Sequence, residues 1–407
     1  MSSDSPTRNC GNGPLAGIKV LDLSQVYLGP YATFLMAKAG ADVIKVEPLQ
    51  GEPARRRADV GKSATFPFCM LNANKQSVTL NLKDEDGRAL LIEMVKRADI
   101  LVENFAPGVM DRLGVGWEVL HATNPRLIYA SGTGYGLSGP DRDTLAMDLT
   151  VQAMSGVMSV TGEPDGPPLK AGPAFVDFIS GVHLYGAVMT ALYERGKIGR
   201  GRLVEVAMQD AVVPTMASNL GLMHNNPGAT AGRTGNRHGG LSISPYNVYP
   251  CRDGYVAIIC MAENHWLALC KAFAADDILS DPRFENNARR VENMQTADEI
   301  VKGWTMTKTR QELLDLARKF RFLCAPVRDL VEVMSDRHLM ERGMLEWVDH
   351  PELGRVVLPN SPLRFHGTEP IVPKPSHKLG ADNSDVYRSW LGLSPDRIAA
   401  LRAAGTI

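Results

Sequence analysis

The sequence predicts an α/β protein with a doubly wound, mostly parallel sheet in a large domain and a smaller α+β domain beside it. Two observations lead to this prediction. Short runs rich in β-branched residues alternate with helical patterns through the first 210 residues, a rhythm typical of βαβ units. The chain of 407 residues is also longer than one hydrophobic core usually supports, which indicates two domains that can be interleaved.

The first half of the chain supplies the elements of that sheet in order. A strand at 18–23 precedes a helix at 30–40, which has Pro near its first turn and Gly at its end. The remaining elements are strands at 42–47, 77–82, 99–103 and 126–130 and a helix at 84–98. Because helices separate most of these strands, we expect them to pair in parallel.

A change of rhythm after about Leu220 sets the predicted domain boundaries. Residues 225–240 are rich in Gly, Asn, Arg and His, as in a long loop or a domain crossing. The predicted segments are a flexible tail at 1–13, a large domain at 14–220, a small domain with its linkers at 221–330 and a return to the large domain at 331–407. The small domain contains a strand at 255–260. The last segment contains a strand at 355–358 and two short helices near Asp385 and Pro395.

Charge and composition exclude several classes of function. Lys plus Arg number 44 against 45 Asp plus Glu, so no overall field attracts nucleic acid or an acidic membrane. No apolar run approaches the roughly 18 residues that span a bilayer, and no signal peptide is expected. The six cysteines are scattered without a C-x-x-C pair, which predicts reduced thiols and a cytoplasmic protein. The histidines show no metal-ligand spacing, so no metal site is expected.

A glycine-rich motif raises the alternative of a nicotinamide-dependent oxidoreductase. Gly134-Tyr-Gly136-Leu-Ser-Gly139 fits the dinucleotide pattern and follows a strand. However, Pro140 follows where a helix should already run, and no acidic partner for a ribose is evident about 20 residues on. We therefore favour a glycine-rich loop at the carboxyl end of a strand.

Asp177 has two interpretations. It follows apolar residues and opens a helical pattern over 179–194. One interpretation is a helix N-cap, because Asp is a favoured cap worth about 1 kcal/mol. The other is a nucleophile, because a carboxylate is ionised at neutral pH and a helix dipole would keep it so. Both roles can hold together.

Around this residue the sequence resembles the class III CoA-transferases, the family of formyl-CoA transferase and carnitine CoA-transferase. The resemblance runs from about Pro14 to Ile407. Its landmarks, in chain order, are 14–23 (PLAGIKVLDL), 40–47 (GADVIKVE), Asn74-Lys75, 99–108 (DILVENFAPG), 124–128 (NPRLI), 131–136 (SGTGYG), 199–202 (GRGR) and 205–210 (EVAMQD).

The resemblance implies a site and a mechanism. Asp177 matches the catalytic aspartate, which would form an acyl anhydride and then an aspartyl-CoA thioester. No metal and no cofactor beyond the substrate coenzyme A is expected. The residues implied in binding CoA or substrate are Val26, Tyr27, Leu80, Lys83, Asn104, Phe105, Arg112, Met147, Asp148, Met208, Gly239 and Gly240. Gly235, Gly239 and Gly240 are the predicted closing loop.

The resemblance also implies a homodimer of interlocked subunits, with acyl-CoA and small carboxylic acids as substrates. The chain departs from formyl-CoA transferase at Tyr27, where that enzyme has glutamine, and at Pro48 and Leu145, where it has basic residues. We therefore expect a different donor, such as succinyl-CoA or another short dicarboxylyl-CoA. Tyr27 and the 233–240 loop are expected to influence the acceptor, with Arg237 or His238 as a carboxylate partner.

Two further alternatives share parts of this pattern. An α-methylacyl-CoA racemase has the same scaffold but needs a second acid or base, and its histidine falls at Met147, whose thioether cannot transfer protons. A non-catalytic acyl-CoA-binding protein would use Asp177 only as a cap.

Overall fold

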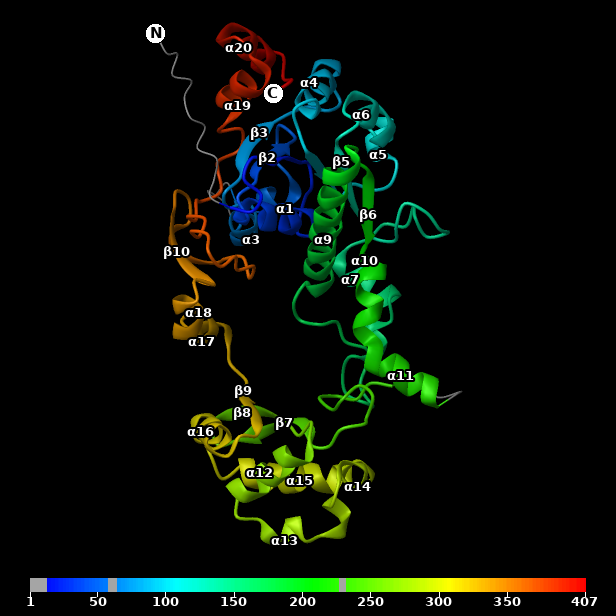
Figure 1. Ribbon diagram of the computed structural model, residues 1–407, viewed down its shortest axis with the longest axis vertical. Coiled ribbons are helices and arrows are strands. Elements are labelled where there is room, and N and C mark those ends of the chain that lie inside the picture. The colour runs from blue at the N-terminus through cyan, green and yellow to red at the C-terminus, as the bar shows by residue number, and fades with distance from the viewer. Residues whose placement is uncertain (1–12, 58–63, 227–231) are drawn as a thin grey trace. The chain divides into compact units, whose positions relative to one another are not determined.

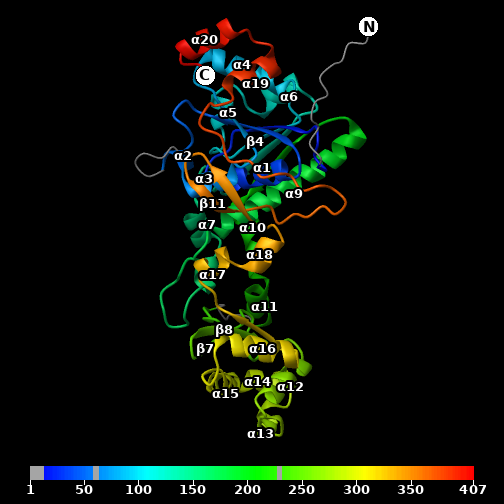
Figure 2. The same ribbon diagram turned by 90° about the vertical axis from the view of Figure 1, so that its left-hand side faces the viewer.

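The computed structural model describes residues 13–57, 64–226 and 232–407, and the chain divides into two compact units. The first unit comprises Met1–Val151, Ala174–Val212 and Asp336–Ile407, and the second comprises Gln152–Pro173 and Val213–Ser335. The elements of each unit can be followed in Figure 1 and Figure 2.

A six-stranded parallel sheet forms the centre of the first unit, as the sequence predicted. Its order is β3-β2-β1-β4-β5-β6, and each neighbouring pair is parallel. The strands are β1 (Lys19–Asp22), β2 (Asp42–Glu47), β3 (Gln76–Thr79), β4 (Ile100–Glu103), β5 (Ile128–Thr133) and β6 (Leu203–Ala207). The first five overlap the predicted runs, whereas β6, at the edge of the sheet, was not predicted.

The carboxyl ends of these strands meet at one edge of the sheet. Leu21 of β1 pairs with Ile44 of β2 on one side and with Leu101 of β4 on the other. The strand order therefore reverses beside β1, and such a reversal is where open α/β sheets usually bind ligands. The loops that follow β1, β2, β4 and β5 leave from this edge.

Helices cover both faces of the sheet (Figures 1 and 2). On one face α1 (Leu28–Lys38) lies beside α9 (Phe175–Ile198). On the other, α4 (Glu85–Val95), α6 (Trp117–Thr123), α19 (Asn383–Leu391) and α20 (Pro395–Ala403) share a core with the strands. Shorter helices in the first unit are α2 (Pro53–Arg56), α3 (Phe66–Leu71), α5 (Val109–Arg112), α10 (Met208–Val212) and α18 (Arg337–Glu341).

Helix α9 corrects one expectation about membranes. At 24 residues it is longer than predicted, and by length and composition it is apolar enough to cross a bilayer, although no such run was expected from the sequence. It lies against α1, β5 and β6, and a third of its apolar stretch is buried there. It ends at Gly199, whose positive φ of 73° suits glycine and whose N–H donates to Arg195 O.

The C-terminal segment forms part of the first unit. Its strands β10 (Leu345–His350) and β11 (Gly354–Pro359) pair as an antiparallel hairpin. Tyr387 of α19 is fully buried and donates from its hydroxyl to Thr79 O at 2.7 Å, and Thr79 N donates to the Asn383 side chain. These bonds join α19 to β3, across more than 300 residues of chain.

The second unit has its own sheet and core. Strands β7 (Tyr246–Cys251), β8 (Gly254–Ile259) and β9 (Leu323–Pro326) pair antiparallel. The helices and 3₁₀ turns that lie within it are α8 (Val157–Val160), η1 (Val213–Met216), α11 (Ala217–Asn225), α12 (Glu263–Ala272), α13 (Asp276–Leu279), η2 (Pro282–Phe284), α14 (Asn287–Glu292), α15 (Met294–Thr305), α16 (Arg310–Phe320) and α17 (Leu330–Met334). Buried Trp266, Phe284 and Leu313 are among its core residues.

The segment 152–173 lies in this second unit, whereas the sequence prediction assigned it to the large domain. Helix α7 (Asp148–Met154) leads into it. Gly235 N donates to Gly162 O at 3.0 Å, and the Arg233 guanidinium donates to Glu163 O at 3.1 Å. These long-range bonds bind the segment to the chain around residue 234, a pairing that local sequence patterns do not encode.

Candidate active site

A cavity of about 290 Å³ opens at the carboxyl edge of the parallel sheet and contains Asp177. Its walls come from the loops after β1, β4 and β5, from α2 and from the starts of α9 and α10. Of the predicted site residues, the cavity is lined by Val26, Asn104, Phe105, Met147, Asp177 and Met208. Predicted residues from four other segments thus line the same cavity as the Asp177 carboxylate.

Asp177 is the third residue of α9 and not its N-cap. The N-cap position is occupied by Ala174, which offers no side-chain hydrogen bond. Asp148 takes over that role from the segment after β5: its Oδ2 accepts from the N–H groups of Val176 at 3.0 Å and Asp177 at 3.2 Å. The interpretation of Asp177 as a helix cap is therefore wrong. The Asp177 carboxylate does not cap the N–H groups at the start of α9.

The surroundings of Asp177 favour its protonated form more than expected. Burial, and then the negative charge of Asp148, raise its pKa to about 7. A helix dipole alone would have kept the group ionised, but loss of solvent and a neighbouring carboxylate act in the opposite direction. A carboxylate with a raised pKa is a stronger base, and perturbed groups in cavities are candidates for catalysis.

The turn after β1 forms another wall of the cavity and is held under strain. Val26 has a φ of 66°, a left-handed conformation that costs a β-branched residue about 1–3 kcal/mol. Asn104 secures the turn through two reciprocal bonds of 2.8 Å, accepting from Gln25 N and donating to Gln25 O. Val26 N donates to Glu52 Oε2 at 3.2 Å. Tyr27 stacks on Phe178, next to the nucleophile, with ring centroids 5.9 Å apart.

A buried ionic cluster beneath this turn was missed by the sequence reasoning. Asp22, Lys45 and Lys75 are each at most 2% exposed. Lys75 donates to Asp22 Oδ2 at 2.9 Å and to Thr33 Oγ1 at 2.8 Å, and Lys45 donates to the carbonyl of Ser24. Burial lowers the pKa of Lys75 to about 8 despite the attraction of Asp22. Lys45 lies in the predicted strand at 42–47 and Lys75 lies just before the one at 77–82, and neither position gave a local signal of this pairing.

A second cavity, of about 500 Å³, follows the ends of β2 and β3. Leu80, Lys83 and Phe105 line it, and Phe105 and Gln25 line both cavities, so the two adjoin at these residues. Its walls are largely apolar and include Leu49, Leu82 and Leu113. Arg112 is on α5 but is not among the described residues that line either cavity.

Gly239 and Gly240, predicted to bind CoA or substrate, belong to the second unit. A Cβ on Gly239 would meet the Asn219 side chain at 2.8 Å. Arg237, expected as a carboxylate partner for substrate, already pairs with Asp298: Nε donates at 2.9 Å and Nη2 lies 2.8 Å away. Tyr249 donates to the same carboxylate at 2.6 Å. Arg237 therefore takes part in an ion pair that stabilises the second unit.

The glycine-rich motif after β5 lines the cavity through Gly134 and, within the described residues, lacks the helix of a dinucleotide-binding site. Gly134 lines the Asp177 cavity, and a Cβ there would lie 2.0 Å from the Ala146 side chain. No helix follows the motif until Asp148, so the helix N-terminus that a pyrophosphate requires is missing from this part of the described chain. Arg57 and Arg142 also line the cavity and were not among the predicted site residues.

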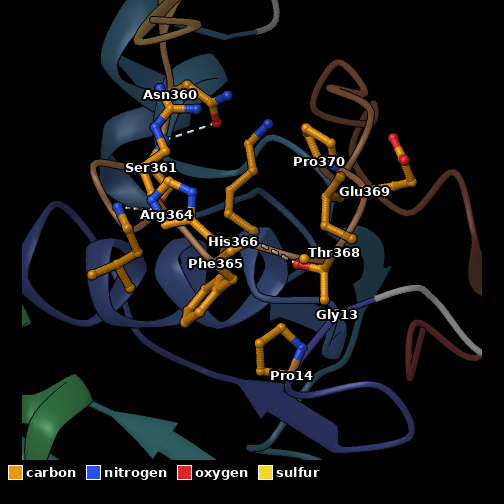
Figure 3. A pocket seen from close by; sticks show the side chains of 14 residues that line it. Gly13, Pro14, Asn360, Ser361, Arg364, Phe365, His366, Thr368, Glu369 and Pro370 are labelled. Atoms are coloured by element: carbon orange, nitrogen blue, oxygen red, sulfur yellow. Dashed lines mark hydrogen bonds between the residues drawn. The ribbon is translucent and has the colours of Figure 1, made fainter.

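Another pocket of similar size, about 280 Å³, lies elsewhere in the first unit (Figure 3). Segment 360–370 curves around Gly13 and Pro14, and Lys38, Arg364 and Glu369 contribute its charged groups. None of the predicted site residues lines it. Within the described residues, no group of three or more His, Cys, Asp or Glu side chains is placed to hold a metal ion.

Comparison with known proteins agrees with this geometry. The model for CoA-transferase family III matches residues 15–383. The chain belongs to CoA-transferase family III. It is thus an enzyme that transfers coenzyme A, and neither an oxidoreductase nor a non-catalytic binding protein.

Relatives from several bacteria share nearly the whole chain. It is 35% identical to a formyl-CoA:oxalate CoA-transferase of Streptomyces avermitilis, covering 97% of this chain and 99% of that protein. It is 32% identical to a succinyl-CoA–D-citramalate CoA-transferase of Chloroflexus aurantiacus over 100% of both. The crystal structure of a CAIB/BAIF family protein from Brucella suis superposes with a TM-score of 0.82 at 31% identity, covering 93% of this chain and 100% of that one.

Proposed function

We propose that this CoA-transferase moves CoA from a short acyl-CoA donor to a small carboxylic acid through covalent intermediates on Asp177. The observation that carries the proposal is the placement of Asp177: it lies in a cavity at the switch point of the sheet, with its carboxylate free of any capping duty. Exchange of one carboxylate for another at a thioester requires a carboxylate nucleophile. It needs no cofactor beyond CoA itself.

Four acyl transfers complete the exchange. An Asp177 oxygen attacks the donor thioester carbonyl, the C–S bond breaks, and an anhydride and CoA thiolate form. The thiolate then attacks the Asp177 carbonyl of the anhydride, releasing the donor acid and leaving an aspartyl-CoA thioester. The acceptor carboxylate attacks that thioester and expels the thiolate again. The thiolate finally attacks the acceptor carbonyl of the new anhydride, which gives the acyl-CoA product and regenerates Asp177.

The electrostatics of the cavity suit this sequence. Free Asp177 is destabilised by burial and by Asp148, which raise its pKa to about 7. Acylation removes its negative charge and with it the repulsion from Asp148. The environment therefore favours the covalent intermediates over the free carboxylate. Both intermediates hydrolyse in water, so a loop that closes over the site is expected, and the glycines at 235, 239 and 240 remain our candidate for it.

The two adjoining cavities support a path for CoA. We assign the thiol end to the Asp177 cavity and the nucleotide end to the cavity of Leu80 and Lys83, with the pantetheine chain passing Gln25 and Phe105. Lys83 would meet a phosphate as a charged donor, as would Arg112 from α5. Asn104 fixes the Gln25 turn through both polar atoms, so its role is to position the turn. Val26, Tyr27, Met147 and Met208 would surround the reacting thioester.

Charges in the cavity bear on the acids exchanged. Arg57 and Arg142 line it together with Asp177, and two cationic side chains in one cavity favour an anionic acyl group. The names of two relatives pair formyl-CoA with oxalate and succinyl-CoA with D-citramalate, so each pair includes at least one acid with two carboxyl groups. We propose short dicarboxylic acids as substrates, with succinyl-CoA as a donor. A cytoplasmic homodimer is part of the same proposal, and the strong exposure of Leu330 and Val331, 79% and 78%, suits a partner surface.

Racemase chemistry on the same scaffold was the nearest alternative expected from the sequence, and one observation weighs against it. Proton transfer at the α-carbon needs an acid or base opposite the aspartate. Met147 lines the cavity at the position where the racemase branch has its histidine, and a thioether cannot serve. Loss of an α-deuterium from an acyl-CoA without any acceptor acid would favour that alternative.

Intact-protein mass after incubation with a panel of acyl-CoAs tests the proposal. We expect wild type to gain the mass of CoA less water and to yield a hydroxamate at Asp177 on treatment with hydroxylamine. Asp177→Asn should gain neither, while Asp385→Asn on the exposed face of α19 should behave as wild type. Adduct formation by the Asp177→Asn protein, or by none of the proteins despite tight CoA binding, would contradict covalent transfer.

A further inference from the structure

We propose that Arg142 selects substrates with a second carboxylate, by binding that remote group while the reacting carbonyl lies at Asp177. The inference rests on the proposed transfer at Asp177 and identifies the side chain that determines the substrate class. It concerns a residue on the loop between β5 and α7, within the first unit.

The position of Arg142 is coupled to that of the nucleophile by one short segment. Arg142, Thr144, Ala146 and Met147 all line the Asp177 cavity. The next residue, Asp148, binds the N–H of Asp177 at 3.2 Å. Arg142 and Asp148 thus belong to one run of seven residues, which connects the arginine in the cavity wall to the side chain that binds the N–H of the nucleophile.

The guanidinium of Arg142 is free to receive an anion. Its Nε donates to Asp143 Oδ1 at 3.3 Å. Its two Nη atoms have no hydrogen-bond partner in the ranges that the structure describes. Asp143 is strongly exposed, 75%, and Arg142 is half exposed, so this contact is a weak surface pair. A planar guanidinium held through Nε presents both Nη groups, the arrangement that binds a carboxylate through two parallel hydrogen bonds.

Charge balance during the reaction favours a dicarboxylic substrate. Once Asp177 is esterified as a thioester or anhydride it carries no charge, and Arg57 and Arg142 remain as the charged side chains among the described lining residues. A monocarboxylic acceptor would supply one negative charge and a dicarboxylic acceptor two. An acyl group with an apolar end would instead desolvate the Arg142 guanidinium without pairing it, which is costly.

Other arginines fit the role less well. Arg237 is already paired with Asp298 in the second unit. Arg57 lines the cavity from the end of α2, but no short segment couples it to Asp177. Arg57→Gln therefore serves as a comparison: it reduces the positive charge of the cavity equally without removing the group that we assign to the remote carboxylate.

The test compares succinyl-CoA with butanoyl-CoA, whose acyl groups have four carbons each and differ in the remote carboxylate. The rate of CoA adduct formation on Asp177 is measured for both donors in wild type, Arg142→Gln, Arg142→Lys and Arg57→Gln. Arg388→Gln, an exposed residue of α19, is the control. We expect Arg142→Gln to lower the succinyl-to-butanoyl rate ratio by about tenfold or more, with butanoyl transfer retained. Arg142→Lys should recover part of the ratio, because lysine keeps the charge and loses the bidentate geometry.

The outcomes separate this inference from the proposal beneath it. An unchanged ratio in Arg142→Gln, with adducts still formed on Asp177, would overturn the assignment and leave covalent transfer intact. An equal or larger loss of preference in Arg57→Gln would also overturn it, because cavity charge alone would then explain the selectivity. Absence of any adduct in wild type would overturn the proposed transfer itself, and the assignment of Arg142 with it.

Discussion

Two carboxylates in the first unit, the fully buried Asp22 and the half-buried Asp177, have opposite electrostatic surroundings. Asp22 is fully buried among Lys45, Lys75 and the hydroxyls of Ser24 and Thr33. Burial raises its pKa, but the two lysines and these hydrogen bonds outweigh burial and hold it well below its usual range. Asp177 has no such cation and faces Asp148, so its pKa rises to about 7.

The difference separates a charge that stabilises the fold from one that is kept reactive. The lysines of the Asp22 cluster also donate to the backbone: Lys45 to the carbonyl of Ser24 after β1, and Lys75 to the carbonyl of Pro30 in the first turn of α1. Asp177 is left with an unfavourable environment that a covalent bond relieves. Strain of this kind is expected where chemistry occurs and is unfavourable elsewhere.

The largest effect on stability should follow removal of the Asp22 charge. Asp22→Asn leaves Lys45 and Lys75 buried beside each other without a counter-ion, and loss of one partner of a buried ionic group typically costs about 3–5 kcal/mol. We expect a matching drop in the free energy of unfolding by urea. Asp385→Asn, at an exposed position, should change it by less than about 0.5 kcal/mol. A drop no larger than that of the control would show that the cluster is not the stabilising site described above.

Asp177→Asn should instead increase the free energy of unfolding, by an amount that depends on pH. The folded pKa of about 7 lies above the unfolded value of 3.8, so ionisation destabilises the fold. The penalty is absent below pH 3.8, grows as pH rises, and is complete above 7. Since the group is partly exposed, we expect about 2–4 kcal/mol of stabilisation by Asp177→Asn at about pH 8. Thermal unfolding should show that gain disappearing at about pH 4. A variant less stable than wild type at alkaline pH would contradict it.

Asp148→Asn tests the source of the raised pKa. The amide oxygen can still accept from the Val176 and Asp177 N–H groups, so the start of α9 should remain, but the negative charge beside Asp177 is lost. The pKa of Asp177 should then fall below 7, and the pH midpoint of adduct formation should fall with it. At about pH 6 the ionised fraction, and the initial adduct rate, should rise about two- to fivefold. A midpoint that stays at wild-type pH would mean that burial alone sets the pKa.

The smallest effect is expected at Asn104. Asn104→Ala removes the two bonds to the Gln25 backbone, and each hydrogen bond of this kind contributes about 0.5–1.5 kcal/mol. We expect a several-fold weaker affinity for CoA, measured by calorimetry, because the turn with left-handed Val26 is no longer held. Asn124→Ala, which removes two bonds to backbone carbonyls and one from Arg126 N, at a position that does not line the cavity, is the control. Equal CoA affinity in both variants would show that the turn is held without Asn104.

Local patterns were informative where an element depends on its own residues. The strand at 42–47 was predicted with the observed bounds, and the C-terminal helices near Asp385 and Pro395 were located, because alternation, capping and Gly/Pro signals are local. Strand β6 was missed although its letters, LVEVA, alternate. Most of it is half-buried, and as an edge strand of the sheet it depends on pairing with β5, more than 70 residues earlier.

The sequence by itself determined the parallel α/β architecture, the family and the identity of Asp177 as the carboxylate to examine. Tertiary structure decided the burial, the neighbouring charges and therefore the pKa of that carboxylate. Asp148, 29 residues before Asp177, supplies both the helix cap and the repulsion, and the loop between β5 and α7 brings Arg142 into the same cavity. Burial and Coulomb interactions depend on distances in space, and residues far apart in the chain acquire those distances only when the strands have paired.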